Sequence, residues 1–136
     1  MNSELRRKAM LQKIISEDTI ELIDNSLFFK KTVGILQYKC IGNYLQIEIF
    51  SVHKDHRNKG SGRILIDELK RLAYIYKVDW IQVYPKSVDV LSDNSIPIDV
   101  LNEKYEKYGF TEKEEGFNYS KPNQLMKMHI DNLSKQ

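Results

Sequence analysis

The sequence is most constrained by a strand-like segment, a glycine-containing loop and a long amphipathic helix that follow one another between residues 44 and 76. The strand is predicted for Tyr44 to Val52, where apolar and polar side chains alternate over the first half. The helix is predicted for residues 61–76, because Leu65, Leu69 and Leu72 share one helical face. This order of elements indicates a mixed fold in which a helix packs back onto a sheet.

The flanking segments extend this unit into an α+β pattern. Gly42 and Asn43 are typical of a hairpin loop before the strand that starts at Tyr44. Pro97 and Gly109 are placed to begin and end a second helix. Strands are predicted for Thr19 to Ile23, Leu27 to Lys30, Val33 to Cys40, Trp80 to Tyr84, Phe110 to Glu114 and Leu125 to Ile130, and helices for about Ser3 to Ser16 and from Pro97 to Tyr108.

Length and charge limit the class of protein. The chain has 136 residues without a repeat or a flexible linker, so we expect one domain over residues 1–136. A net charge of +2 does not favour nucleic acid as a partner. The longest charge-free stretch, Cys40 to Ile47, is far shorter than the roughly 20 residues of a membrane span. No apolar core follows Arg6-Arg7-Lys8 and there is a single cysteine, so we expect a cytoplasmic protein.

The alternation in the strand from Tyr44 to Val52 shifts by one residue near its middle. Leu45, Ile47 and Ile49 share one face, but Phe50 and Val52 then continue the apolar pattern on the other. One extra residue in a β-bulge produces such a shift. A strand end that is buried on both faces explains the pattern equally well.

The loop Arg57-Asn58-Lys59-Gly60-Ser61-Gly62 is a candidate anion-binding site. Its two glycines allow positive φ angles, and the start of the following helix adds unpaired amides and the positive end of a dipole. Arg63 adds positive charge. The loop matches neither the dinucleotide-binding nor the nucleoside-triphosphate-binding pattern. A glycine-rich turn with solvated charges is the alternative interpretation.

The sequence resembles the GCN5-related N-acetyltransferase (GNAT) family in two places. The strand, Arg57-x-x-Gly60-x-Gly62 and the helix look like that family's acetyl-CoA-binding motif, and residues 101–110 resemble its second signature. The resemblance covers about Leu27 to Ile130. It implies the GNAT fold, a mixed and mostly antiparallel sheet flanked by helices, in which the strands matching Tyr44 to Val52 and Trp80 to Tyr84 splay apart to hold the cosubstrate.

The resemblance also implies roles for particular residues. Backbone groups of Phe50, Ser51 and Val52 would bind the pantetheine arm of acetyl-CoA. Tyr105 matches the tyrosine that often protonates the departing thiolate, and Glu48 matches a glutamate that serves some members as general base. The amides that would hold the pyrophosphate belong to Arg57, Asn58, Lys59, Gly60, Ser61, Gly62 and Arg63.

These roles are chemically complementary. Acyl transfer to an amine needs a base that removes a proton from the nucleophile and an acid for the thiolate, which a carboxylate and a phenol can supply. Each residue also has a purely structural interpretation, since Glu48 fits an outward position on a strand and Tyr105 shares helical spacing with Leu101 and Tyr108.

Three positions depart from the family's pattern in the second motif. Many members have an asparagine seven residues before the tyrosine, a small residue three before it and an apolar residue directly before it. This sequence has Ile98, Asn102 and Lys104 there. These departures put cofactor contacts from this helix in question.

The region before the motifs is also shorter than in typical members. Two helices usually separate the first two strands, and here we expect only the turn Asp24-Asn25-Ser26. A compact member of this kind would have an open acceptor groove, which suits a protein or peptide amine as well as a small-molecule amine.

Two functions of different class therefore stay open. The first is an enzyme that transfers acetyl from acetyl-CoA to an amine by direct attack, with Glu48 as base and Tyr105 as acid. The second is a non-catalytic CoA-binding or protein-interaction module.

His53, His56 and His129 do not form a metal-ligand spacing with other residues of the sequence, so we assign no metal. The sequence leaves the oligomeric state open.

Overall fold

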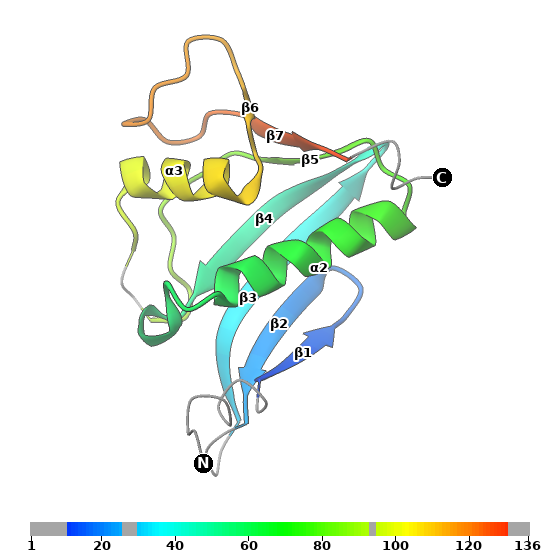
Figure 1. Cartoon of the computed structure of the whole chain (residues 1–136), viewed down its shortest axis with the longest axis vertical. Helices are drawn as coiled ribbons and strands as arrows, with labels where there is room; N and C mark the ends of the chain where they lie inside the picture. Colours follow the sequence, from blue (N-terminus) through cyan, green and yellow to red (C-terminus); the bar gives the residue numbers. More distant parts are fainter. Residues whose placement is uncertain (1–10, 26–29, 93–94, 131–136) are drawn as a thin grey trace.

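The protein is described by a computed structural model that covers residues 11–25, 30–92 and 95–130. Its centre is a seven-stranded sheet with the order β1-β2-β3-β4-β5-β7-β6 (Figure 1). The strands are β1 (Leu11–Ile15), β2 (Thr19–Asp24), β3 (Lys31–Ile41), β4 (Tyr44–Val52), β5 (Trp80–Val83), β6 (Glu112–Lys113) and β7 (Met126–His129). The helices are the short η1 (Lys54–His56), α2 (Ser61–Ile75) and α3 (Ile98–Tyr108).

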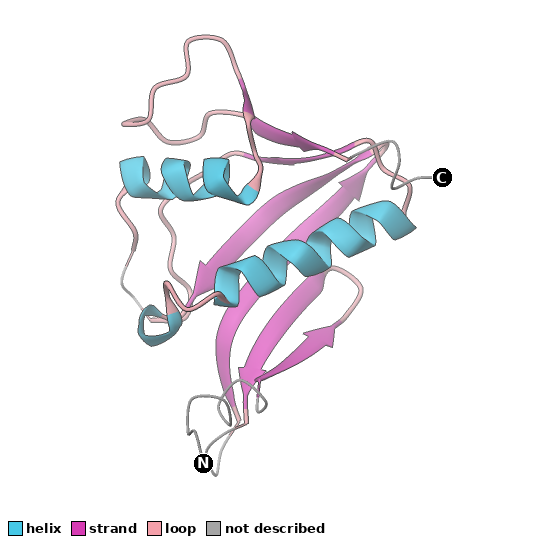
Figure 2. Ribbon diagram, in the orientation of Figure 1, coloured by secondary structure: helices cyan, strands magenta, loops and turns pink. Residues whose placement is uncertain are grey.

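The predicted central unit is confirmed. Strands β3 and β4 form a hairpin around Gly42, whose φ is +57°, and α2 follows β4 through the glycine loop. Helix α2 packs across β2, β3 and β4, and buries Leu65, Leu69 and Leu72 against the sheet (Figure 2). Leucines at this spacing form one apolar stripe, which explains why the helix lies along the sheet.

The predicted bulge in β4 is also confirmed, and it lies at Glu48. Gln37 of β3 pairs with Ile49, whereas the next residue, Tyr38, pairs with Ile47. Glu48 is therefore the extra residue that has no partner in the ladder. The bulge re-aims the second half of β4, so that Phe50 and Val52 take over the apolar pattern.

Strands β4 and β5 are the parallel pair, and they stay together over a short distance. Tyr44, Leu45 and Gln46 pair with Trp80, Ile81 and Gln82, and the pairing ends there. The second half of β4 therefore has no strand partner on its β5 side. The expected GNAT fold, mixed and mostly antiparallel with splayed β4 and β5, is the observed one.

The second predicted helix begins and ends where expected. Pro97 precedes the first residue of α3, and Gly109 follows the last with a φ of +119°. That left-handed conformation is one that glycine adopts without steric cost. Chain reversal at this glycine brings Phe110 into the core, where its side chain is fully buried.

The prediction of a helix over about residues 3–16 is wrong for its described part. Residues 11–15 form β1, which pairs antiparallel with β2 from Leu11 opposite Asp24 to Ile15 opposite Ile20. Residues 3–10 lie outside the described part, as do Leu27 to Phe29 of another predicted strand. The apolar residues of 11–15 fit a strand as well as a helix, and pairing with β2 decides between them.

The predicted turn Asp24-Asn25-Ser26 begins at the end of β2 and lies partly outside the described residues, since Ser26 is not described. Strands β1 and β2 are joined by residues 16–18, closed by a hydrogen bond from the Ser16 amide to the Thr19 carbonyl at 2.9 Å. No helix separates these two strands.

Candidate functional site

A hollow lies where β4 leaves β5, between the glycine loop and α3. The end of β4 contributes Phe50, Ser51 and Val52 to its lining, which are the three residues that the resemblance assigned to the pantetheine arm. The loop and the start of α2 contribute Arg57, Asn58 and Gly62, and α3 contributes Leu101, Lys104, Tyr105 and Tyr108. Lys86, Val88 and Ile96 of the β5–α3 connection complete it.

The start of α2 offers backbone donors to this hollow. Gly60 precedes the helix with a φ of +87°, and no side chain caps the first turn. The first amides of a helix have no partner inside it, so those of Ser61, Gly62 and Arg63 are available to an anion. Gly60 can take this left-handed conformation because it has no Cβ.

Gly62 is needed because the ring of Tyr108 lies against it. A Cβ at Gly62 would be 2.2 Å from Tyr108 Oη and 3.4 Å from the Phe50 ring. Tyr108 is held there by Phe50, at 5.9 Å between ring centroids, and by the Arg63 guanidinium 5.0 Å above its ring. Because residue 62 has no side chain, Tyr108 of α3 can pack closely against the start of α2.

The predicted loop residues divide into two groups. Arg57, Asn58 and Gly62 line the hollow. Lys59, Gly60, Ser61 and Arg63 are not among its lining residues. Their predicted role rests on amides, and it stays a prediction.

The hollow is positively charged. Arg57, Lys86 and Lys104 line it, and no carboxylate is among its lining residues within the described part of the chain, although Arg57 is paired with Asp89, which does not line the hollow. The N-terminal end of α2, where the helix dipole is positive, adds to this positive charge. An anionic ligand would therefore be attracted to it.

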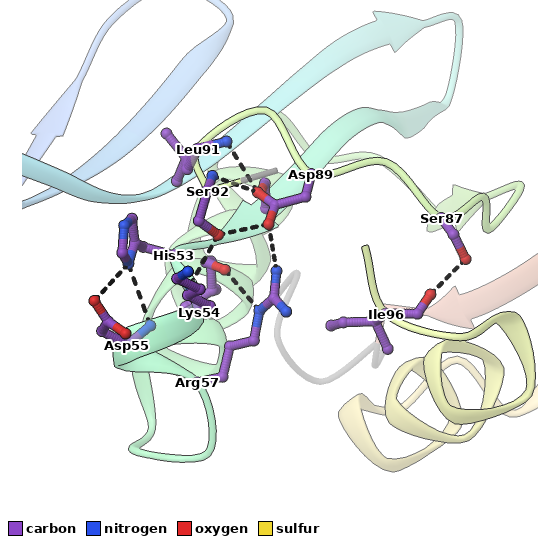
Figure 3. A network of polar contacts seen from close by, with 11 residues as sticks. His53, Lys54, Asp55, Arg57, Ser87, Asp89, Leu91, Ser92 and Ile96 are labelled. Carbon is purple, nitrogen blue, oxygen red and sulfur yellow. Dashed lines mark hydrogen bonds and ion pairs between the residues drawn. The ribbon is translucent and has the colours of Figure 1, made fainter. Parts of the chain in front are cut away.

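A buried carboxylate, Asp89, holds several residues that line the hollow, and Figure 3 shows its polar contacts. The side chain of Asp89, 1% exposed, pairs with Arg57 at 2.7 Å and accepts a hydrogen bond from Ser51 Oγ at 3.0 Å. Arg57 Nε in turn donates to the Val52 carbonyl at 2.9 Å. These contacts bind the β5–α3 connection to the end of β4, so Asp89 has a structural role here.

A second hollow lies beside the first, and Glu48 lines it. Ile47, Ile49, Val83 and Tyr84 form its walls, and it shares Phe50, Lys86, Val88 and Tyr105 with the first hollow. Glu48 Oε1 is 3.1 Å from Lys39 Nζ on β3, and its side chain is 31% exposed. Glu48, the bulge residue, thus brings a carboxylate to the second hollow but not to the first.

Tyr105 stands between the two hollows. It is 4% exposed and its ring packs edge-on against Phe50 and Phe110. Burial raises the pKa of Tyr105 well above the ordinary value for a phenol. The phenol therefore holds its proton throughout the neutral range.

The departure at Asn102 has a structural explanation. Its amide is fully buried and donates to the carbonyls of Tyr119 at 2.8 Å and Lys121 at 3.1 Å. Asn102 thus ties α3 to the loop before β7. It holds the helix in place instead of contacting the hollow.

Sequence reasoning did not assign Lys104, Tyr108 or Asp89 to the site. Tyr108 had a usable signal, since it lies one turn after Tyr105 on the same helical face. Asp89 and Lys104 act through contacts with residues 32 and 46 positions away. No local pattern marks contacts of this length.

The family model described as an acetyltransferase (GNAT) domain matches residues 18–112. That match spans β2 to the start of β6 and contains both hollows. The chain belongs to the GNAT family. Comparison with the curated proteins finds no match.

Solved GNAT structures share the fold at low identity. An acetyltransferase of the family from Staphylococcus aureus is 18% identical, with a TM-score of 0.61 over 83% of this chain and 67% of its own. PaiA N-acetyltransferase from Thermoplasma acidophilum, solved with coenzyme A, is 15% identical, with a TM-score of 0.60 over 92% and 65%. A Bacillus anthracis acetyltransferase solved with acetyl-CoA is 22% identical, with a TM-score of 0.60 over 92% and 68%. This GNAT chain spans about two thirds of their lengths.

Neither a membrane-spanning helix nor a metal-binding cluster is found among the described residues. No helix among them is long and apolar enough to cross a membrane. No group of three or more His, Cys, Asp or Glu side chains in the same ranges could hold a metal ion.

Proposed function

We propose that this GNAT chain binds acetyl-CoA in the first hollow and transfers the acetyl group to an amine that enters from the second. The observation that carries the proposal is the arrangement of two hollows that share Phe50 and Tyr105. One has the uncapped helix start and the cations, and the other has the carboxylate Glu48. A donor and an acceptor that approach from opposite sides would meet at the shared residues.

The residues of the first hollow suit a coenzyme A thioester. The amides at the start of α2 and the cations around them fit a diphosphate. The end of β4, which has no strand partner on its β5 side, leaves backbone groups of Phe50, Ser51 and Val52 for an extended amide-containing arm. Val88, Ile96 and Leu101 also line this hollow, and such apolar side chains suit the carbon chain of that arm.

Tyr105 is proposed as the general acid. A thiolate that leaves the thioester needs a proton, which a phenol can supply, and Tyr105 carries its proton at neutral pH. Tyr105 lines both hollows, which supports a role at the point where donor and acceptor would meet. Burial among Phe50 and Phe110 fixes the ring and keeps water away from it.

Glu48 is proposed as the general base, acting directly or through a water molecule. An ammonium group must lose a proton before it can attack, and a carboxylate in the acceptor hollow can receive it. The Lys39 ion pair sits on the exposed side of this carboxylate, with Lys39 itself 68% exposed. An exposed ion pair of this kind is weak, so an incoming amine can replace Lys39.

The acceptor is proposed to be a primary amine of a peptide, a protein or a small molecule. The walls of the second hollow are mainly apolar, and the short β1–β2 turn supports the expectation of a compact member with an open acceptor groove. We further propose a single domain over residues 1–136 that works in the cytoplasm.

A non-catalytic CoA-binding or protein-interaction module is the second candidate. It is favoured by one observation, the ion pair in which Lys39 engages the carboxylate of Glu48. A module of this kind would bind coenzyme A without turning over any amine.

The Tyr105→Phe variant tests the acid. Thiol release from acetyl-CoA is followed with a pool of polyamines, aminoglycosides and lysine peptides. We expect kcat to fall about 100-fold with little change in CoA affinity, because the phenol proton acts only in the transition state. Tyr44→Phe, at the far end of β4, is the matched control. Equal kcat in Tyr105→Phe and wild type would contradict the assignment.

Two variants of the ion pair test the base. Glu48→Gln removes the carboxylate and Lys39→Met removes the same ion pair while it keeps the carboxylate. We expect kcat to fall about 100-fold in Glu48→Gln only. A similar loss in both variants would mean that the pair is structural, and CoA binding without turnover in the wild type would favour the module.

A further inference from the structure

Lys104 occupies a place in the first hollow that the family's pattern leaves to an apolar residue. It lies on α3, one residue before Tyr105, and its side chain lines the hollow together with Arg57 and Asn58. Its ammonium is 3.3 Å from Asn58 Oδ1 in the glycine loop. Lys104 therefore reaches across the hollow from the helix to the loop.

This ammonium has no anionic partner within the described ranges. Its only polar contact there is the neutral Asn58 amide, and no carboxylate lies within ion-pair distance. Arg57, by contrast, is neutralised by Asp89 at 2.7 Å. Burial lowers the pKa of Lys104, and the nearby cations Arg57 and Lys107 lower it further. A half-buried cation among cations is costly unless an anion joins it.

The position of Lys104 restricts which anion this is. Lys104 lines the first hollow but not the second, where Glu48 lies. Its contact is with Asn58, which has a φ of +60° and precedes the helix start by three residues. The amides of that helix start are the donors that fit a diphosphate.

We propose that Lys104 binds the diphosphate of coenzyme A from the side opposite to the α2 amides, so that the anion bridges α3 and the glycine loop. This inference rests on the proposed function. The ammonium donates to Asn58 Oδ1, and a diphosphate would be the stronger acceptor. Lys104 thereby replaces contacts from this helix that Ile98 cannot make.

Titration calorimetry with three probes tests this role. The probes are coenzyme A, 3′-dephospho-coenzyme A, which keeps the diphosphate, and pantetheine, which has no phosphate. For Lys104→Met we expect about tenfold weaker binding of the first two and unchanged binding of pantetheine, because a charge-assisted hydrogen bond is lost. Lys104→Arg keeps the charge and should restore most of the affinity.

Lys107→Met is the matched control. It removes one positive charge from the next turn of the same helix, but its side chain is exposed and does not line the hollow. We expect a change in coenzyme A affinity of less than threefold. Thermal unfolding of Lys104→Met without ligand should occur at or above the wild-type temperature, since a poorly solvated charge has been removed.

Each outcome decides between stated alternatives. Equal losses in Lys104→Met and Lys107→Met would overturn the proposal in favour of general charge attraction. A loss for coenzyme A but not for its 3′-dephospho form would assign Lys104 to the 3′-phosphate instead. A loss that includes pantetheine would show a structural role. If the wild type binds none of the probes, the proposed function itself fails.

Discussion

At the scale of single residues, Gly62 and Tyr108 control how closely α3 approaches the start of α2. The Tyr108 hydroxyl lies where a Cβ of residue 62 would be, at 2.2 Å, and Phe50 and Arg63 hold its ring in place. A helical glycine usually costs stability relative to alanine. Here a glycine is required, since the side chain next to it cannot move away freely.

This contact predicts the sign of one substitution. Gly62→Ala should destabilise the fold by about 1–3 kcal/mol, because the gain in helix propensity is smaller than the cost of overpacking. In Gly62→Ala/Tyr108→Phe the nearest atom becomes a ring carbon at 3.2 Å, so most of the loss should be recovered. Urea unfolding of the two single variants and the double variant measures the coupling. Additive effects would contradict the contact.

Residues that act through neighbours in the sequence could be predicted, and those that act across the fold could not. Gly60 and Gly62 belong to a local loop motif, and Tyr105 to a local helical one. Asp89 appeared in the sequence as one acidic residue of an irregular loop. Its role depends on Ser51 and Arg57, which the fold brings to it.

At the scale of elements, a buried carboxylate joins β1 to α2. Glu68 of α2 is 2% exposed in its side chain, and it accepts hydrogen bonds from Lys13 of β1 at 2.9 Å and from Arg71. Burial alone would raise the pKa of Glu68, but the bonds from Lys13 and Arg71 outweigh it and lower the pKa below the ordinary value. The ionised form is therefore the one that stabilises the fold.

The sign of the pH dependence follows from this lowered pKa. The contribution of Glu68 is fully present above its unfolded-state pKa and is lost as the pH falls through its folded-state pKa. We expect Glu68→Gln to lose about 2 kcal/mol of stability at pH 7 and much less near pH 3. Denaturant unfolding at several pH values measures this, with Asp67→Asn, an exposed neighbour, as control. Parallel curves for Glu68→Gln and wild type would rule the contribution out.

The contacts of β1 with β2 and α2 also explain why the prediction of a helix over this segment is wrong. The segment from Leu11 to Ile15 is short, and its apolar positions suit either period. Its strand conformation comes from pairing with β2 and from the Lys13–Glu68 bond across 55 residues. Helix α2 could be predicted because it has four turns of consistent spacing, and its own sequence determines its buried face.

At the scale of the whole molecule, the site results from the divergence of one pair of strands. The chain order of strand, loop, helix and strand made the parallel β4–β5 pair predictable through the family resemblance. Where the two strands separate depends on pairing that ends at Gln46 and Gln82. The division into two hollows with Tyr105 between them depends on side-chain packing from four parts of the chain, so it could not be derived from sequence.

The central claim is that the first hollow holds coenzyme A between the glycine loop and α3. Titration of the isotope-labelled protein with coenzyme A, followed by amide NMR, tests it most directly. The account predicts saturable binding of one coenzyme per chain, with the largest shifts in the amides of Phe50 to Arg63 and of α3. Absence of binding, or shifts confined to the distant β1–β2 hairpin, would contradict it.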